Sequence, residues 1–367
     1  MGTTLAMLAA PAQAAPSELP GPTPSFNGTV LAVAYSGSTV YLGGDFTAAV
    51  VRGKAVARSR LAAVNARTGE LLPWAPAADG RVKAIATSGT AVYVAGDFTT
   101  VGGKRRDSLA RLDGRTGAIS SAFKHTVEGR PLALAVSSSR LYAGGAFSAV
   151  DGQTRGRLAA FRLTSGALDT RWKPTADSQV EALATGGGRV YVGGRFRRIN
   201  SVAGHERLAA LDPSSAAVVA GFKPVSPAAT FGLAVTSTGV YTAHGGQGGT
   251  ASSFSLSGAK RWTATFDGDA QAVGVLGDTV YVGGHFDRAC RTALTGMQGT
   301  CLDGSDDRVK MAALAVNDGH LRDWTADANG VVGVLTMAVN RGLSSLAVGG
   351  AFTMIGGRAQ KRFAQFG

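Results

Sequence analysis

Glu, Cys and His are scarce in this chain of 367 residues. Glu occurs at only five positions, whereas helical domains are usually rich in Glu, Lys and Leu, so an α-helical fold is disfavoured. Gly, by contrast, occurs 52 times, which suits a chain that reverses direction often in β-turns. No run of about 20 apolar residues is present, so no membrane-spanning helix is predicted. Hydrophobic residues make up 45% of the chain, which is enough for a packed core.

The two cysteines, Cys290 and Cys301, are eleven residues apart. The only nearby residue that could join them in a zinc site is His285, and this spacing does not suit zinc. In an oxidising compartment we expect the two thiols to form a disulfide that contributes about 2–4 kcal/mol. No metal site and no cofactor are therefore predicted.

Motifs of catalysis are also missing. The five histidines fall in different parts of the chain, and none lies in an H-E-x-x-H spacing. No G-x-S-x-G elbow is present. The glycine-rich run 245–249 lacks the Gly-Lys-Ser/Thr ending of a phosphate-binding loop. No catalytic residue is assigned, and the pattern is more typical of a binding module than of an enzyme.

The N-terminal residues have the features of an export signal. Residues 5–10 are apolar, and Ala12-Gln13-Ala14 provides the small side chains that signal peptidase prefers. No basic segment precedes them, so we expect residues 1–14 to be the remnant of a truncated signal peptide and residues 15–18 to be a linker. The mature protein is predicted to be secreted.

An internal repeat dominates the rest of the chain. The pattern Tyr-[Val/Leu/Ala]-[Gly/Ala]-Gly-x-Phe recurs at intervals of about fifty residues, which indicates a repeat architecture. Clear copies and two decayed copies together make seven. The clear copies begin at Tyr41, Tyr93, Tyr142, Tyr191 and Tyr281, and the decayed copies begin at Tyr241 and Ala347.

Each copy has the same internal order. An apolar stretch such as 30–34 precedes the Tyr motif, and a Leu-Ala-Ala segment such as 61–64 follows it after a polar loop. A Gly-containing turn then leads to a segment that ends in Trp or Phe, as at Trp74. This order predicts four short antiparallel strands per copy. One such sheet cannot bury both faces alone, so the copies must stack, and radial closure leaves only short edges.

The two ends of the chain favour a closed ring. Residues 363–366 match the third strand, so the last copy lacks its fourth, and residues 24–28 precede the first strand where other copies have their Trp or Phe segment. We therefore predict an all-β, seven-bladed β-propeller whose N-terminal strand completes the last blade. It forms a single domain of residues 19–367, with an insertion at 288–309 in blade six.

The motifs Y-V-G-G-x-F-T, L-A-A-L, T-G and W-x-P together resemble those of the bacterial delta-sixty-type β-propeller repeats. The resemblance covers roughly residues 19–367 and is weakest at the copy that begins at Tyr241. It implies a propeller in an exported protein. It implies little about function, because one fold hosts many functions.

Positive charge is the main functional signal. The formal net charge is +13, which favours anionic partners. In a propeller the 2–3 and 4–1 connections of the blades share one face, and here the 2–3 connections are long and basic. Asp79, Asp177 and Asp327 lie in 4–1 connections, nearer the channel mouth. The candidate ligand-binding residues are Arg58, Arg60, Lys104, Arg105, Arg106, Arg155, Arg157, Arg197, Arg198, Arg358, Lys361 and Arg362.

Three functions fit these observations. The favoured one is a secreted, lectin-like or adhesion or toxin-complex module that binds a surface glycan, an anionic cell-wall polymer or a protein through the basic face. Nucleic acid is a less favoured partner. The second is a polysaccharide hydrolase or lyase with carboxylates at the channel mouth. The third is a structural scaffold within a larger exported assembly. Against the first stands the alternative that these arginines only solvate loops and pack on their neighbours.

Overall fold

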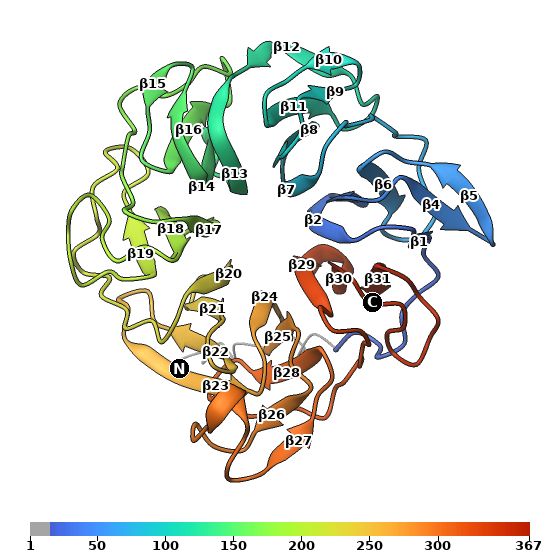
Figure 1. Ribbon diagram of the computed structural model, residues 1–367, viewed down its shortest axis with the longest axis vertical. Coiled ribbons are helices and arrows are strands. Elements are labelled where there is room, and N and C mark those ends of the chain that lie inside the picture. Colours follow the sequence, from blue (N-terminus) through green and yellow to red (C-terminus); the bar gives the residue numbers. More distant parts are fainter. Residues whose placement is uncertain (1–14) are drawn as a thin grey trace, which may run out of the picture.

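The computed structural model describes residues 15–367, and within them the chain is all-β, as predicted. The helical elements of this range are two short 3₁₀ turns, η1 (Met297–Gly299) and η2 (Arg341–Leu343). No helix in residues 15–367 has the length and hydrophobicity to cross a membrane. The predicted signal-peptide remnant, residues 1–14, lies outside the described residues. Figure 1 shows the sheets arranged radially around a centre, which is the arrangement of a β-propeller.

The main sheets follow the sequence repeat, and we number them 1 to 7 in chain order. In each, the first strand pairs antiparallel with the second, and the second pairs with the third. The first four sheets are β2 (Val30–Ser36), β3 (Thr39–Gly44) and β6 (Leu61–Asn65); β7 (Val82–Ser88), β8 (Ala91–Gly96), β11 (Leu109–Asp113) and β12 (Ile119–Lys124); β13 (Val127–Val136), β14 (Arg140–Val150) and β16 (Leu158–Arg162); and β17 (Val180–Gly186), β18 (Arg189–Gly194) and β19 (Leu208–Leu211).

Sheets 5 to 7 continue the series, and several short strands lie outside it. Except for β1, which precedes the first strand of sheet 1, these outer strands come from the long connections between second and third strands. These elements are β20 (Thr230–Val235), β21 (Val240–His244), β22 (Gly249–Phe254) and β23 (Lys260–Phe266) in sheet 5; β24 (Ala270–Leu276), β25 (Thr279–Gly284) and β28 (Met311–Ala315) in sheet 6; β29 (Val334–Asn340), β30 (Ser345–Gly350) and β31 (Phe363–Phe366) in sheet 7; and β1 (Ser25–Phe26), β4 (Ala48–Val51), β5 (Lys54–Ala57), β9 (Thr100–Val101), β10 (Lys104–Arg105), β15 (Gln153–Thr154), β26 (Arg288–Cys290) and β27 (Ser305–Asp307) outside the series.

The predicted fourth strand forms fully only in sheets 2 and 5, as β12 and β23. In sheets 1, 3, 4 and 6 the corresponding segment makes a single bridge to the third strand. In three of these segments a proline, at Pro76, Pro174 or Pro224, follows the aromatic residue. Proline has no N–H to donate and would block pairing at its own position. The bridges end several residues before it, however, and the segment of sheet 6 pairs as little with Ala326 at this place. The prediction of four full strands in every sheet was therefore wrong for these sheets.

The glycine pair of the repeated motif is explained by two close approaches. A Cβ on Gly44 would lie 2.1 Å from the carbonyl oxygen of Thr29, at the bulge where the first strand begins. A Cβ on Gly43 would lie 2.6 Å from Cγ1 of Val82 in the next sheet. Gly349 of sheet 7 makes the same contact with Val30 of sheet 1 at 2.5 Å. The absence of a side chain at the first glycine thus lets neighbouring sheets pack closely. Its absence at the second lets the backbone at the start of the first strand approach the second strand.

The first strands contact one another in a cyclic order. Each packs against the first strand of the preceding and the following sheet, and β2 packs against both β7 and β29. Sheet 1 and sheet 7 are therefore neighbours, as Figure 1 also shows.

Tryptophan indoles tie sheets 1, 3 and 5 to the sheets that follow them. The Nε1–H of Trp74 donates to the carbonyl of Asp113 in sheet 2 at 3.0 Å, and Trp172 of sheet 3 makes the equivalent bond to sheet 4. The Nε1–H of Trp324 in sheet 6 donates to the carbonyl of Pro16 at 2.8 Å. The N-terminal segment is thus the acceptor for this indole.

The strand expected at residues 24–28 lies elsewhere than predicted. β1 pairs with β4 of the first long connection and not with the last sheet. The N–H of Phe26 donates to the carbonyl of Lys361 at 3.1 Å, just before β31, and its ring packs on Phe363. The backbone bond to β31 itself comes from further upstream, where the N–H of Gly21 donates to the carbonyl of Gln365 at 2.8 Å. Residues 24–28 thus contact the last sheet without adding a strand to it.

Candidate functional site

The molecule has two unlike faces. One is formed by the connections between second and third strands together with the segments that lead into each next first strand, and we call it the loop face. A β-bridge between Ala78 and Val101, and another between Ala176 and Ile199, join these leading segments to the second-to-third connections. The other, the turn face, consists of tight turns. The second-to-third connections contain 20 of the 37 Lys and Arg residues but only nine of the 24 Asp and Glu residues. They comprise residues 45–60, 97–108, 151–157, 195–207, 245–248, 285–310 and 351–362.

Half of the predicted basic site residues are part of the scaffold. Arg106 and Arg155 are only 7% and 4% exposed, and their guanidinium groups donate to backbone carbonyls such as that of Ser120, at 2.9 Å. Burial lowers the pKa of Arg155. These groups brace the connection before each third strand. The half-buried members of this set are Arg58, Arg60, Arg157 and Arg362, of which Arg58, Arg157 and Arg362 also donate to backbone carbonyls.

The other half are exposed, and they come from sheets 2, 4 and 7. Arg105 pairs with Asp107 at 3.3 Å. The side chains of the remaining five make no ion pair with any part of residues 15–367. The structure therefore does not gather all the predicted residues into one site. It leaves a set of exposed cations around the loop face: Lys104, Arg105, Arg197, Arg198, Arg358 and Lys361.

The carboxylates expected near the channel mouth accept hydrogen bonds from backbone N–H groups of the loops. Oδ1 of Asp79 accepts the N–H groups of Thr99 and Thr100 at 2.8 and 2.9 Å. Partial burial raises the pKa of Asp79, but these bonds and that of the Thr99 hydroxyl outweigh it and lower the pKa to about 2. Asp177 and Asp327 accept loop N–H groups in the same way. These three residues fix the loops.

Ion pairs occupy other charged side chains of the loop face near the first strands. Lys83 lies 2.8 Å from Asp97, and Arg195 lies 2.9 Å from Glu181. Residues 15–367 contain no group of three or more His, Cys, Asp or Glu that could hold a metal ion. Asp79, Asp177 and Asp327 accept loop N–H groups, and Asp97 and Glu181 are in ion pairs.

A cavity of about 530 Å³ opens on the turn face, where four first strands end. Its walls are mainly apolar side chains of β20, β24 and β29, including Leu233, Val273 and Met337, and Tyr35 of β2 lies at one side. The Tyr35 hydroxyl bonds to Ser345 at 2.9 Å, and burial raises its pKa to about 12. This tyrosine is therefore a neutral wall of the cavity.

Sheet 5 contains a buried polar cluster that the sequence analysis did not anticipate. His244 stands where the other sheets have the second glycine of the motif, and it is fully buried. The Thr242 hydroxyl donates to the carbonyl of Ser252, so it accepts Nε2–H of His244 at 2.6 Å. Nδ1 accepts from Thr230 at 3.2 Å. Burial lowers the pKa of His244 to about 3, so the imidazole is neutral.

We expect His244 to make the stability of the protein depend on pH. In the unfolded chain the imidazole gains a proton as the pH falls below about 6.5, whereas in the folded chain it remains neutral down to about 3. The unfolded state thus binds more protons in this window, so the free energy of unfolding decreases as the pH is lowered. Between pH 7 and 4.5 the stability advantage of the native chain over His244→Gln should shrink by roughly 2 kcal/mol.

Urea denaturation of both proteins at the two pH values measures this difference. His320→Gln is the control, because the side chain of His320 is 86% exposed. A pH-independent difference between native chain and His244→Gln would contradict the assignment.

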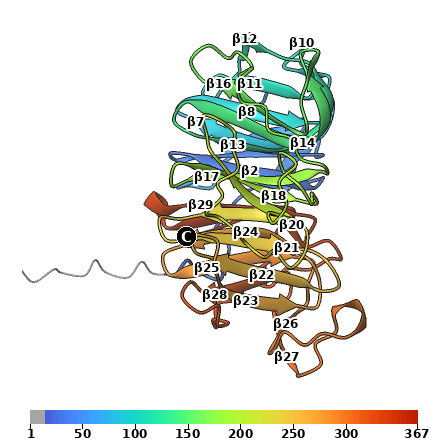
Figure 2. The same cartoon turned by 90° about the vertical axis from the view of Figure 1, so that its left-hand side faces the viewer.

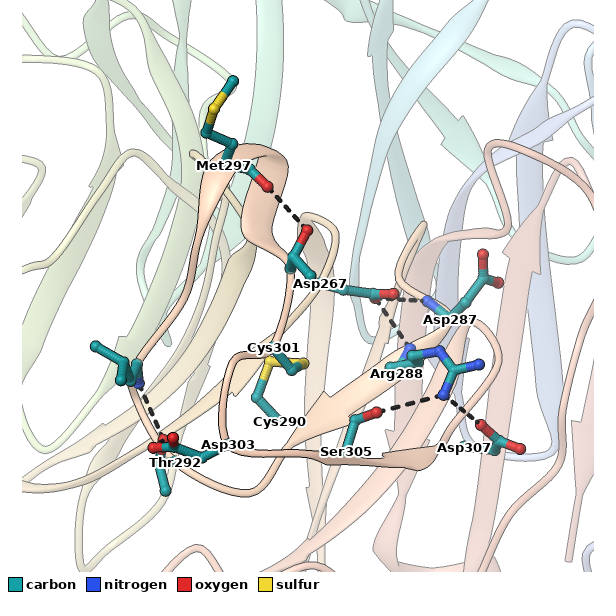
Figure 3. The surroundings of a disulfide bond; sticks show 12 residues. Asp267, Asp287, Arg288, Cys290, Thr292, Met297, Cys301, Asp303, Ser305 and Asp307 are labelled. Atoms are coloured by element: carbon teal, nitrogen blue, oxygen red, sulfur yellow. Dashed lines mark hydrogen bonds and ion pairs between the residues drawn. A yellow bond between two sulfur atoms is a disulfide. The ribbon is translucent and has the colours of Figure 1, made fainter.

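The insertion in sheet 6 carries the disulfide, as predicted. Cys290 and Cys301 are bonded, and β26 and β27 pair with each other on either side of the loop (Figure 3). Its charges pair internally: Arg288 lies 3.3 Å from Asp307, and Arg291 lies 3.1 Å from Asp306. Asp303 accepts the Thr292 hydroxyl. Disulfides persist in oxidising compartments, which is consistent with a location outside the cytoplasm.

Comparison with known proteins supports the class of fold. Solved structures of the WD40 β-propeller domain of Doa1, of a chain of the mitotic checkpoint complex and of U3-55K superpose with TM-scores of 0.57, 0.63 and 0.60. Their sequence identities are 9, 12 and 9%, covering 97, 100 and 93% of this chain and 96, 98 and 95% of theirs. At such identities the likeness shows the fold alone.

The protein is therefore a β-propeller. A family model described as "Domain of unknown function (DUF5122) beta-propeller" matches residues 92–117, which span β8 to the turn after β11. No curated protein shows significant similarity to the sequence.

Proposed function

We propose that residues 19–367 form one closed, seven-bladed propeller of the delta-sixty-type repeat class, and that it is an exported, non-enzymatic binding module. The cyclic contacts of the first strands and the Gly349–Val30 contact support closure. The bond from Trp324 to Pro16 supports a role for the N-terminal segment in it. The disulfide supports export.

The loop face is the proposed recognition surface, and its ligand is an anionic surface glycan, cell-wall polymer or protein. The observation that carries this proposal is the concentration of cations there, with exposed and unpaired members in three sheets. Arg197, Arg198 and Arg358 are such residues. Guanidinium groups that are free to move suit phosphate and carboxylate groups on an extended partner. The channel-mouth carboxylates fix loops, so nothing favours the hydrolase alternative.

A matched pair of variants tests the proposed face. Lys104, Arg198 and Arg358 are changed to Gln in one variant, and Arg67, Arg115 and Lys260 of the turn face in the other, so that both lose three positive charges. We expect the native chain and the turn-face variant to be retained on a dextran-sulfate matrix, and the loop-face variant to elute at clearly lower salt. Equal shifts for both variants would mean that net charge alone, not the face, drives retention.

A further inference from the structure

The exposed apolar side chains gather on the loop face. Within residues 15–367 every large hydrophobic side chain that is strongly exposed lies in a long connection, in a segment leading into a first strand, or in the N-terminal segment. The tight turns of the turn face contribute none of this set. The members are Leu19, Val202, Val225, Leu294, Met297, Leu302, Val331, Val332 and Met354.

Most of these residues form one arc over sheets 4 to 7. Val202 belongs to sheet 4, the insertion to sheet 6 and Met354 to sheet 7. The insertion extends furthest, since the loop of β26 and β27 projects beyond the rest of the disk in Figure 2. Met297 at its tip is 83% exposed and points away from the other labelled residues in Figure 3.

The tip is held in one shape. The Cys290–Cys301 disulfide closes its base, and the N–H of Leu302 donates to the carbonyl of Leu294 at 3.2 Å. Gly299 has a φ of +82°, and a Cβ there would lie 2.5 Å from Cα of Gly248 in sheet 5. Glycine therefore lets the tip rest directly on the neighbouring sheet. The exposed side chains of Leu294, Met297 and Leu302 are displayed by a rigid support and are not left over from a mobile loop.

Cations stand next to the apolar residues. Arg197 and Arg198 share the connection of Val202, and Arg358 and Lys361 share that of Met354. The charges of the insertion, in contrast, are largely neutralised by its internal ion pairs. The arc thus combines protruding apolar side chains with unpaired positive charge, whereas the apolar cavity opens on the opposite face.

We propose that the loop face docks on a lipid bilayer with anionic headgroups, with the tip around Met297 entering the headgroup region and the cations of sheets 4 and 7 lying against the phosphates. This goes beyond the ligands of the proposed function and rests on its assignment of the loop face as the recognition surface. A soluble polyanion would explain the cations but would leave the apolar side chains in water. A bilayer interface receives both kinds of group, because isolated apolar side chains enter it without a preformed socket.

Flotation with vesicles tests the proposal. Vesicles of phosphatidylcholine alone are compared with vesicles containing equal amounts of phosphatidylcholine and phosphatidylglycerol. We expect the full chain to float only with the second kind. Changing Leu294, Met297 and Leu302 to Ser leaves every charge in place and should weaken partitioning roughly a hundredfold, at about fivefold for each side chain, since each enters the interface only in part.

A second variant separates the two contributions. Changing Arg197, Arg198 and Arg358 to Gln should also weaken partitioning roughly a hundredfold, at about fivefold for each cation. The turn-face variant at Arg67, Arg115 and Lys260 is its matched control and should float like the native chain. Far-ultraviolet circular dichroism and thiol titration establish that each variant is folded and that the Cys290–Cys301 disulfide is intact.

The outcomes distinguish this inference from the proposed function. Flotation that is lost in both the apolar and the loop-face cation variants supports bilayer docking. Flotation that is unchanged in the apolar variant overturns it, because binding is then electrostatic only. If the native chain is retained on dextran sulfate but does not float with either vesicle, the inference fails and the proposed function stands. If it does neither, both fail.

Discussion

Replacing Gly194 by Ala is expected to lower the free energy of unfolding by about 3 kcal/mol. A Cβ at this position would lie 2.2 Å from the carbonyl oxygen of Gln179 and 3.0 Å from Cα of Val180. Both are backbone atoms, so no side chain can rotate to make room. Relief requires β17 to move away from β18, and β17 also packs against the first strands of both neighbouring sheets.

Gly221→Ala is the matched control for this substitution. A Cβ on Gly221 meets nothing within 4 Å. The added methyl should therefore change stability by no more than a few tenths of a kcal/mol, or raise it slightly by restricting the unfolded chain. Guanidinium denaturation of the three proteins measures both effects. Equal stabilities would show that the strand bulge is softer than its geometry indicates.

A chain that begins at Pro22 should be less stable than one that begins at Ala15 by about 3 kcal/mol or more. The shorter chain loses the bond from Gly21 to Gln365, the bond from Thr325 to Glu18, and the acceptor of Trp324. Each lost bond is worth about 1 kcal/mol, and a buried indole N–H without an acceptor costs more. Thermal and denaturant unfolding of the two chains gives the difference.

Trp324→Phe separates the lost acceptor from the other effects of truncation. In the chain that begins at Ala15 this substitution removes a donor that has its partner, so it should destabilise. In the chain that begins at Pro22 the donor is already unsatisfied, and the same substitution should cost less. A cost that is equal in both chains would exclude Pro16 as the energetic partner of Trp324.

The repeat made the sheets predictable because its residues act through local chemistry. Gly43 and Gly44 recur because two backbone approaches recur, and Trp74 and Trp172 recur because each reaches the next sheet. These requirements leave the same or a similar residue at the same place in most copies. The disulfide followed from composition alone, since the chain has only two cysteines.

The fate of the basic residues was not predictable in the same way. Arg106 and Arg105 are adjacent in sequence, yet one is buried and the other has a side chain that is 80% exposed. A long arginine side chain can reach either solvent or a carbonyl about fourteen residues away, as Arg106 does at Ser120. Sequence spacing does not show which of the two occurs, because burial of the side chain depends on whether a backbone carbonyl of a neighbouring segment lies within its reach.

The position of the N-terminal segment was missed for a related reason. Residues 24–28 resemble the aromatic segment of the other copies, but Phe26 lies in β1, which pairs with β4. Its ring centroid is 4.6 Å from that of Phe46 and 6.2 Å from that of Phe363. The hydrogen bonds that reach the last strand come from upstream residues without a distinctive pattern.

The disulfide-bonded insertion has a further consequence for the neighbouring sheet. Its strand β26 pairs with the end of β23 at Thr265 and Phe266, so a segment from sheet 6 covers part of the outer edge of sheet 5. The repeat motif of sheet 5 is one of the two decayed copies, and without β26 this end of β23 would present unpaired backbone groups to other molecules. The two sheets are thereby joined along their rims as well as at the centre, and they should open as one cooperative unit. Detaching β26 would lengthen the open edge of β23 on which a second molecule could add a strand.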